Sequence, residues 1–189
     1  MNIGLFFGSF NPIHIGHKVI ASYLVEFSSL DQVKFVVSPQ NPLKIKKNLL
    51  DEYHRLQIIR SEIEDNSKLS VSNIEFTMPQ PSYTIDTLIR LEEKYPGNNY
   101  SIIMGSDNLK TFHKWKNYKN ILSSYKIYVY PRFGEQVIKS HKNIHLISDV
   151  PQMNISASFI RKCIKEGKDA SYLVPEKAWK YIEEMNFYK

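Results

Sequence analysis

The sequence has a single cysteine, Cys163, which excludes an internal disulfide framework and a cysteine-rich metal site. We expect Cys163 to be a small buried apolar side chain on a helix. Glycine and proline are few, at 7 and 9 of 189 residues, as in an ordinary globular chain. No apolar run approaches the roughly 18 residues that a membrane span needs. The first residues also lack the features of a signal peptide, so we expect a cytoplasmic protein without a membrane partner.

Acidic residues are the minority among the charged ones, with 19 Asp and Glu against 25 Lys and Arg and a net charge of +6. This balance attracts partners that carry phosphate, which include both nucleic acids and nucleoside triphosphates. The lysines are scattered apart from a modest cluster at Lys44, Lys46 and Lys47. No segment interleaves basic and aromatic residues in the manner of an RNA-binding motif, so we expect no nucleic-acid partner.

Short apolar runs alternate with helical patterns along the chain. Strands are predicted over 3–7, 33–37, 69–74, 100–104, 125–130 and 144–147, and helices over 15–27, 51–63, 84–95, 158–166 and 175–185. This alternation predicts an α/β protein with a Rossmann-like, doubly wound parallel sheet and helices on both faces. We find no linker, so residues 1–189 are expected to form one domain. Ligands bind beyond the carboxyl ends of such strands, which directs attention to the loops after Phe7, Val37 and Met104.

The loop after the first predicted strand, from Gly8 to His17, contains neither G-x-G-x-x-G nor G-x-x-x-x-G-K-[ST]. These absences argue against a dehydrogenase and a P-loop ATPase. The loop places His14 and His17 on the same face at the start of a helix. Imidazoles can donate hydrogen bonds to phosphate oxygens there, because the helix N-terminus already favours an anion. Gly16 permits close approach of the backbone. The alternative is a pair of polar residues without a ligand.

This stretch resembles the signature of the nucleotidyltransferase superfamily, in which a G-x-F-x-P turn leads into H-x-G-H. The resemblance implies an α/β fold and makes His14 and His17 catalytic. The residues of the stretch that it assigns to ATP binding are Gly8, Ser9, Phe10, His14, Gly16 and His17. Class I aminoacyl-tRNA synthetases share a related H-I-G-H element, but they are much longer and need a tRNA-binding region that is absent from this sequence.

A second anion site is predicted near the other end of the chain. Ser156, Ser158 and Arg161 stand at the start of a predicted helix, where hydroxyls, free N–H groups and a fixed positive charge favour phosphate. The alternative is a serine that serves as an N-cap. The segment resembles the superfamily element I-S-[ST]-[ST]-x-[IV]-R, which implies ATP binding by all three residues and a catalytic role for Arg161. Ala157 departs from this pattern by one missing hydroxyl.

Three more segments resemble the nicotinate (nicotinamide) mononucleotide adenylyltransferase branch of the superfamily. Residues 81–88 are similar to P-S-Y-T-x-x-T-L, residues 105–115 to G-x-D-x-L followed by Trp, and residues 41–44 to N-P-x-H-K without its histidine. The resemblance extends from residue 3 to about residue 182. It assigns ATP binding to Gly105 and Asp107, and it assigns mononucleotide binding to Lys44, Thr84 and Trp115.

The chemistry of these positions suits a pyridine mononucleotide. A cationic pyridine ring favours an aromatic face, and tryptophan is the best such face. Thr84, at the start of a helix, offers a hydroxyl and a backbone N–H to a carboxylate. Asp107 can accept hydrogen bonds from ribose, and Lys44 can reach a phosphate. The structural alternatives are a core aromatic for Trp115, an N-cap for Asp107 and a solvated side chain for Lys44. Arg132 is a further candidate for a phosphate contact.

These assignments predict a nicotinate-nucleotide adenylyltransferase, which transfers AMP from ATP to nicotinate mononucleotide in NAD biosynthesis. The products are deamido-NAD and pyrophosphate. Mg²⁺ is expected to arrive with ATP, so no protein metal site is predicted. Nicotinamide mononucleotide and phosphopantetheine stay open as alternative acceptors. A rival from another class is a non-catalytic dinucleotide sensor or RNA-binding protein. The sequence is compatible with a homo-oligomer and leaves the oligomeric state open.

Overall fold

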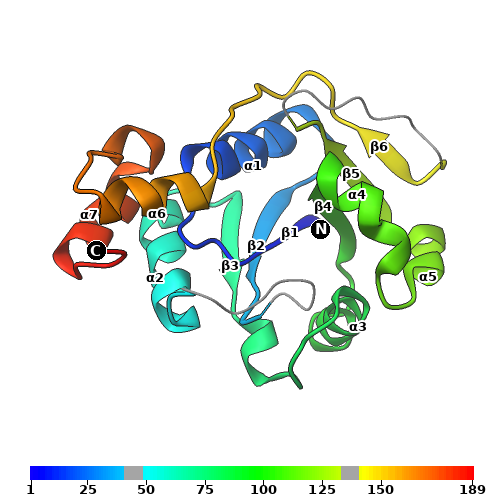
Figure 1. Cartoon of the computed structure of the whole chain (residues 1–189). Helices are drawn as coiled ribbons and strands as arrows, with labels where there is room; N and C mark the ends of the chain where they lie inside the picture. Colours follow the sequence, from blue (N-terminus) through cyan, green and yellow to red (C-terminus); the bar gives the residue numbers. More distant parts are fainter. Residues whose placement is uncertain (41–48, 133–140) are drawn as a thin grey trace.

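The computed structural model describes residues 1–40, 49–132 and 141–189, and a parallel sheet forms the centre of this part of the chain (Figure 1). Its six strands lie in the order β3-β2-β1-β4-β5-β6, and all five pairings are parallel. The strands are β1 (Asn2–Gly8), β2 (Gln32–Val37), β3 (Leu69–Ser72), β4 (Asn99–Gly105), β5 (Lys126–Tyr130) and β6 (Ile144–Leu146).

The described helices lie on both faces of the sheet, so the predicted doubly wound α/β fold is confirmed. The α-helices are α1 (Ile15–Phe27), α2 (Glu52–Ile63), α3 (Thr84–Lys94), α4 (Ser106–Thr111), α5 (Tyr118–Ser124), α6 (Ala157–Lys165) and α7 (Glu176–Glu184). Short 3₁₀ turns, η1 (Ile74–Thr77), η2 (Phe112–Lys114) and η3 (Ser171–Leu173), complete the described elements.

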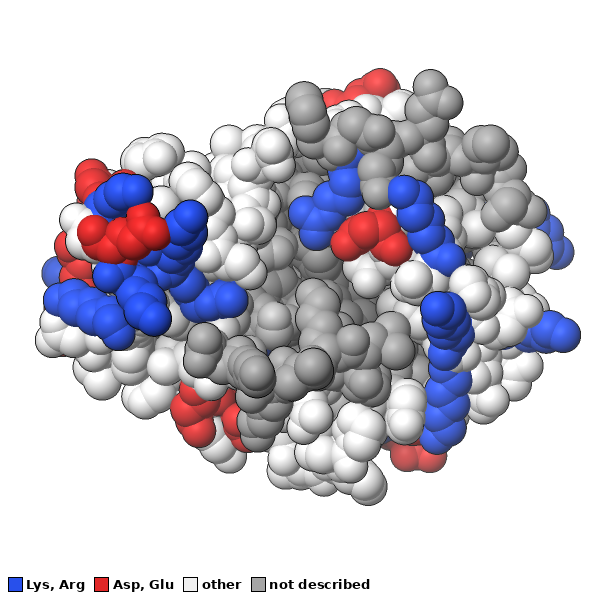
Figure 2. Space-filling model, in the orientation of Figure 1, with Lys and Arg blue, Asp and Glu red and all other residues white. Residues whose placement is uncertain are grey.

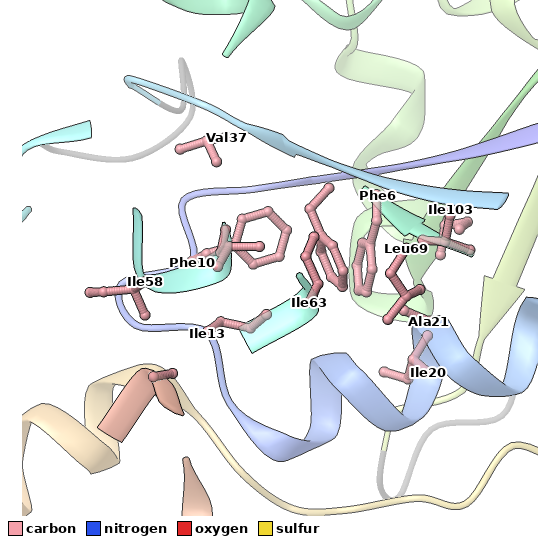
Figure 3. Close-up of a cluster of buried hydrophobic side chains, with 14 of the residues drawn as sticks. Phe6, Phe10, Ile13, Ile20, Ala21, Val37, Ile58, Ile63, Leu69 and Ile103 are labelled. Atoms are coloured by element: carbon pink, nitrogen blue, oxygen red, sulfur yellow. The ribbon is translucent and has the colours of Figure 1, made fainter. Parts of the chain in front are cut away.

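The buried side chains of the strands point to two separate cores because successive side chains alternate across a strand. Phe6 belongs to the core beneath α1, α2, α6 and α7, where it lies close to Phe10 and Ile20 (Figure 3). Leu5 belongs to the opposite core with the buried residues of α3 and α5. Both faces of β1 are therefore buried, which accounts for its continuous apolar run.

The order of the strands reverses between β1 and β4, which are neighbours although β2 and β3 lie between them in the chain. Their carboxyl ends, at Gly8 and Gly105, therefore diverge toward loops on opposite sides. A doubly wound sheet binds its ligands in the crevice at this switch point. The topology thus places the site before any side chain is considered.

Local hydrogen bonds explain the start of α2 and one wrong prediction. The Asp51 side chain accepts a hydrogen bond from the Tyr53 amide at 2.9 Å, which caps α2 at its predicted start. The strand predicted over 69–74 ends at Ser72, whose hydroxyl accepts the Ile74 amide proton at 3.2 Å. This local hydrogen bond takes the Ile74 amide away from the sheet. The short helices α4 and α5 were not predicted, because so few residues show no clear period.

Cys163 is buried on α6, with 6% of its surface exposed, as expected for a small apolar side chain. The chain's aromatic C-terminal side chains, among them Trp179 and Tyr181, pack against the same core. None of the helices within the described ranges combines the length and the apolar character that a membrane crossing requires.

Candidate active site

A cleft of about 520 Å³ opens at the carboxyl ends of β1, β2, β4 and β5. This volume falls within the range of small-molecule sites, roughly 300–1,000 Å³. The predicted site residues that line it are Gly8, Ser9, Phe10, His14, His17, Thr84, Gly105, Asp107, Trp115, Ser156, Ser158 and Arg161. Lys44 lies outside the described residues. The segments predicted from both ends of the chain therefore share one cleft.

Two stacked imidazoles form the wall of this cleft at the start of α1. His14 is the residue before the helix, and its ring lies 3.6 Å from that of His17, centroid to centroid. The backbone N–H of His14 donates to Nδ1 of His17 at 3.3 Å. In the neutral imidazole the other nitrogen then carries the proton, so the tautomer of His17 presents Nε2–H as a donor.

Gly16 lies next to the His14 ring, outside the cleft. Gly16 is not one of the described residues that line the cleft. It lines a small adjoining cavity together with His14 and His17. A Cβ atom at this position would lie 3.1 Å from Nδ1 of His14. The glycine thus leaves room for the imidazole of His14. That Gly16 also permits the close backbone approach of a triphosphate stays a prediction.

The start of α6 forms the opposite wall. The Ser156 hydroxyl caps α6 by accepting the Phe159 amide proton at 3.2 Å, so the N-cap alternative is correct for this residue. Because a hydroxyl that accepts one hydrogen bond can still donate another, capping does not exclude a phosphate contact. Nη2 of Arg161 donates to the Ser158 hydroxyl at 3.3 Å.

Arg161 also joins the two walls. Its Nη1 donates to the carbonyl oxygen of Asn11 at 2.7 Å, across 150 positions of sequence. The side-chain oxygen of Asn11 in turn accepts the Tyr188 hydroxyl at 2.9 Å and the Leu50 amide at 3.2 Å. Tyr188 therefore holds the first loop in place from the far end of the sequence.

The loops after β4 and β5 meet at a third side of the cleft. Nε of Arg132 lies 3.4 Å from Oδ1 of Asp107, and its backbone N–H donates to the Ser106 hydroxyl at 2.9 Å. Asp107 stands in the first turn of α4, after the N-cap residue Gly105. A Cβ atom on Gly105 would lie 2.4 Å from Oδ1 of Asp107, so a larger residue there would displace this carboxylate. Exposed ion pairs are weak, which leaves Arg132 able to exchange Asp107 for a phosphate.

Thr84 and Trp115 line the far end of the cleft. Thr84 is the first residue of α3, whose N-cap residue Tyr83 makes no side-chain cap. The Trp115 ring packs edge-on against Phe112 at 5.3 Å between centroids. Nζ of the next residue, Lys116, donates to both carboxylate oxygens of Asp86 on α3, at 3.0 and 2.8 Å. This bridge ties the tryptophan segment to the start of α3.

Positive charge predominates in the described lining of the cleft. Figure 2 shows Lys and Arg side chains toward α6 and α7 on one side of this face and toward α4 on the other. The charged lining residues are Lys114, Lys116, Arg132 and Arg161 against Glu75 and Asp107. Such a cleft attracts anionic ligands. Within the described ranges no three His, Cys, Asp or Glu side chains are grouped so that they could hold a metal ion.

Comparison with known proteins agrees with this geometry. The model of the cytidylyltransferase-like family matches residues 5–163. A protein of Flavobacterium johnsoniae named "Probable nicotinate-nucleotide adenylyltransferase" is 53% identical over the full length of both chains. A protein of Bacteroides fragilis with the same name is 45% identical, over 95% of this chain and 90% of its own.

The chain belongs to the nicotinate-nucleotide adenylyltransferase family. The resemblance stated from its motifs is thereby confirmed. Among solved structures, the fold is similar to that of the Plasmodium falciparum nicotinic acid mononucleotide adenylyltransferase complexed with NaAD, with a TM-score of 0.82. The match covers 99% of this chain and 97% of that one, at 19% sequence identity.

Burial holds the two imidazoles of His14 and His17 in their neutral form. Burial, with a smaller contribution from the charge of Arg132, lowers the pKa of His14 to about 4. Burial also lowers the pKa of His17, as do the nearby His14 and Arg132. Nδ1 of His14 is buried and has no hydrogen-bond partner among the described residues. Both rings are therefore neutral at pH 7.

The depressed pKa of His14 predicts that the ligand-free protein loses stability in mild acid. The unfolded chain binds the proton near pH 6.5, whereas the folded protein binds it only near pH 4. Stability from this group is therefore complete above pH 6.5 and lost as the pH falls toward 4. We expect His14 alone to lower the free energy of unfolding by about 3 kcal/mol between pH 7 and pH 4. Urea unfolding at several pH values measures this slope.

A His14→Gln variant should show a shallower dependence on pH than the natural protein. A matched His113→Gln variant, which changes an exposed histidine, should keep the original slope. Equal slopes for the natural protein and the His14 variant would contradict the assignment of a depressed pKa to this ring.

Several residues of the cleft escaped the sequence-based prediction. Glu75, Asn11 and Lys116 line it without having been singled out, and Arg132 had been only a weak candidate. Asn11 lies within the Gly8–His17 motif, so its position in the sequence already indicated that it lies near the site. Glu75 and Lys116 belong to no motif, and only the fold brings them to the cleft.

Proposed function

We infer that this chain is a nicotinate-nucleotide adenylyltransferase, which transfers AMP from ATP to nicotinate mononucleotide and releases deamido-NAD and pyrophosphate. One observation supports this most directly: the two histidines, the serine–arginine turn and the Thr84–Trp115 end share one cleft at the switch point of the sheet. Relatives that match the whole chain carry the same activity in their names.

The part of the cleft between the two histidines and the start of α6 suits the triphosphate of ATP. The attacking group is the 5′-phosphate of the mononucleotide, which is already anionic, so no general base is needed. It displaces pyrophosphate from the α-phosphorus, and catalysis consists of positioning and charge stabilisation. In this proposal His14 and His17 donate hydrogen bonds around the α-phosphorus. Ser156, Ser158 and Arg161 hold the departing pyrophosphate.

Residues near the first loop and β4 would bind the rest of ATP. The main chain at Gly8 and Ser9 follows β1 directly, and Phe10 supports the loop from the core. Gly105 and Asp107 follow β4, where the Asp107 carboxylate can accept hydrogen bonds from ribose hydroxyls. Gly16 contributes indirectly, through the space that it leaves for His14.

ATP is proposed to enter as its Mg²⁺ complex. The ion prefers oxygen ligands, whereas the proposed phosphate contacts are imidazoles, hydroxyls and a guanidinium. Its ligands would therefore be mainly phosphate oxygens and water. When bound, Mg²⁺ neutralises charge that develops on the phosphates. The cytoplasmic location and the absence of a nucleic-acid partner stay predictions from the sequence.

The decisive experiment is pyrophosphate release from ATP with each acceptor in parallel. We expect rapid release with nicotinate mononucleotide, slower release with nicotinamide mononucleotide, and none above background with phosphopantetheine. Faster turnover with nicotinamide mononucleotide would redirect the assignment within the family. Absence of release with either mononucleotide would contradict the proposed function.

The stacking role proposed for Trp115 predicts a selective loss of mononucleotide affinity. A cation–π contact with a desolvated ring contributes about 1–2 kcal/mol. Trp115→Ala should therefore raise the KM for nicotinate mononucleotide by a factor of about 10, with the KM for ATP changed less than about twofold. Trp115→Phe should retain part of the affinity. Initial rates at varied concentrations of each substrate separate the two constants.

Trp179→Phe is the control, because this other tryptophan lies on α7 and packs against the core away from the cleft. We expect it to leave both KM values unchanged. An equal rise in both constants for Trp115→Ala would indicate a general disturbance of the cleft and would contradict a stacking role.

A further inference from the structure

A carboxylate is buried behind the start of α3. Glu75, in η1, is only 2% exposed, yet it lines the cleft with Ser82 and Thr84. One of its oxygens accepts the Ser82 hydroxyl at 2.7 Å, and the other accepts the Thr87 hydroxyl at 2.9 Å. The Ser38 side chain, which follows β2, adds a further hydrogen bond. None of the ion pairs among the described residues includes Glu75.

This carboxylate gathers three separate segments of the chain. Ser38 follows β2, Ser82 precedes α3, and Thr87 lies in the first turns of α3. The backbone of η1 is fixed as well, because the Gln80 side chain donates to the carbonyl oxygen of Glu75 at 3.0 Å. A buried charge is costly unless hydrogen bonds satisfy it. The donors to Glu75 are neutral hydroxyls and not a cation, so the carboxylate fixes the positions of these hydroxyls.

The hydrogen bonds to Glu75 decide which donors remain available in the cleft. The hydroxyl protons of Ser82 and Thr87 are directed at the carboxylate and away from any ligand. Tyr83, between Ser82 and α3, makes no side-chain cap. The first N–H groups of a helix have no partner within the helix. The hydroxyl of Thr84 and the N–H groups at the start of α3 thus stay available to a ligand.

We propose that Glu75 is a positioning residue for the acceptor substrate: it clamps Ser82 and Thr87 on either side of Thr84 and so aims the start of α3 at the mononucleotide. This proposal rests on the proposed function and adds to it how the acceptor substrate is positioned. Glu75 does not touch the reacting phosphates. Its effect is confined to the end of the cleft that contains Thr84 and Trp115, so it should act on the acceptor and not on ATP.

The test is Glu75→Gln, which keeps the size of the side chain but replaces one acceptor oxygen with an N–H donor. The hydroxyl that faces this N–H then loses its acceptor. We expect the KM for nicotinate mononucleotide to rise about 10-fold while the KM for ATP changes less than about twofold. Glu93→Gln, which removes an exposed charge from α3, is the matched control and should change neither constant.

Two further variants keep the test informative if Glu75→Gln folds poorly. Ser82→Ala and Thr87→Val each remove one partner of the carboxylate and should also raise the KM for the mononucleotide alone. Combined with Glu75→Gln, each should add less than its separate effect, because the same contact has already been lost. Additive effects, or equal rises in both KM values, would overturn the positioning role.

Calorimetric titration of nicotinate mononucleotide into the protein without ATP separates this inference from the proposed function. Binding by the natural protein that weakens about 10-fold in Glu75→Gln would support the clamp even without turnover. If the natural protein turns over and the KM for the mononucleotide is unchanged in all three variants, the positioning role of Glu75 is contradicted. The proposed function would still stand.

Discussion

Replacing His17 by alanine is expected to lower kcat by a factor of about 100 or more, a typical loss for one donor that acts in the transition state. The structure gives the reason, because the His14 amide occupies Nδ1 of His17 and so directs its Nε2–H as a hydrogen-bond donor. The measurement is the initial rate of pyrophosphate release with ATP and nicotinate mononucleotide, both at saturating concentrations.

Two isosteric variants separate this donor from the structural role of the ring. The side-chain oxygen of His17→Asn can still accept the His14 amide proton, but nothing replaces Nε2. The longer side chain of His17→Gln carries an N–H donor toward the position of Nε2. We therefore expect the Asn variant to be as inactive as the Ala variant and the Gln variant to retain more turnover.

His113→Ala changes an exposed histidine and should leave kcat unchanged. It controls for the general effect of removing a histidine. Near-normal turnover in His17→Ala would contradict the role of this imidazole. A large loss in His17→Ala with full activity in His17→Asn would assign the effect to the hydrogen bond with His14 instead.

The Arg55→Met variant is expected to be the least stable of those considered, with a free energy of unfolding lower by about 3–5 kcal/mol. Arg55 on α2 is fully buried at 0% exposure. Its guanidinium donates to four backbone carbonyl oxygens, of Leu50 at 2.7 Å, Ser9 at 2.6 Å, Ser38 at 2.9 Å and Pro39 at 3.4 Å. Without Arg55 these buried acceptors lose their donors.

Urea unfolding measures this loss, and Arg60→Met on the same helix is the matched control. Arg60 is exposed, so its replacement should cost less than about 1 kcal/mol. Arg55→Lys should be intermediate, because an ammonium group keeps the charge but cannot span carbonyls from separate loops. A cost for Arg55→Met no larger than that for Arg60→Met would contradict the proposed loop anchor.

Local patterns predicted the elements that pack against the cores. The runs around Leu5 and Ile102 are buried on both faces, and the helical spacing of Ile20 and Leu24 places both against the sheet. Such patterns depend on neighbours within a few residues, so they can be read directly from the sequence. They failed where a local hydrogen bond decided the outcome, as at Ser72, and where helices were too short to show a period.

The sequence by itself determined the alternation of strands and helices and the residues at both phosphate-binding turns, because each depends on contacts within one short segment. It did not determine which strands are neighbours, since an apolar run does not specify the strand with which it pairs. Only the tertiary structure decided that Arg161 meets Asn11, that Tyr188 holds the first loop, and that Glu75 joins Ser82 to Thr87. The physical reason is that a hydrogen bond needs its two atoms about 3 Å apart. For residues on separate elements the strand order and the helix packing set that separation.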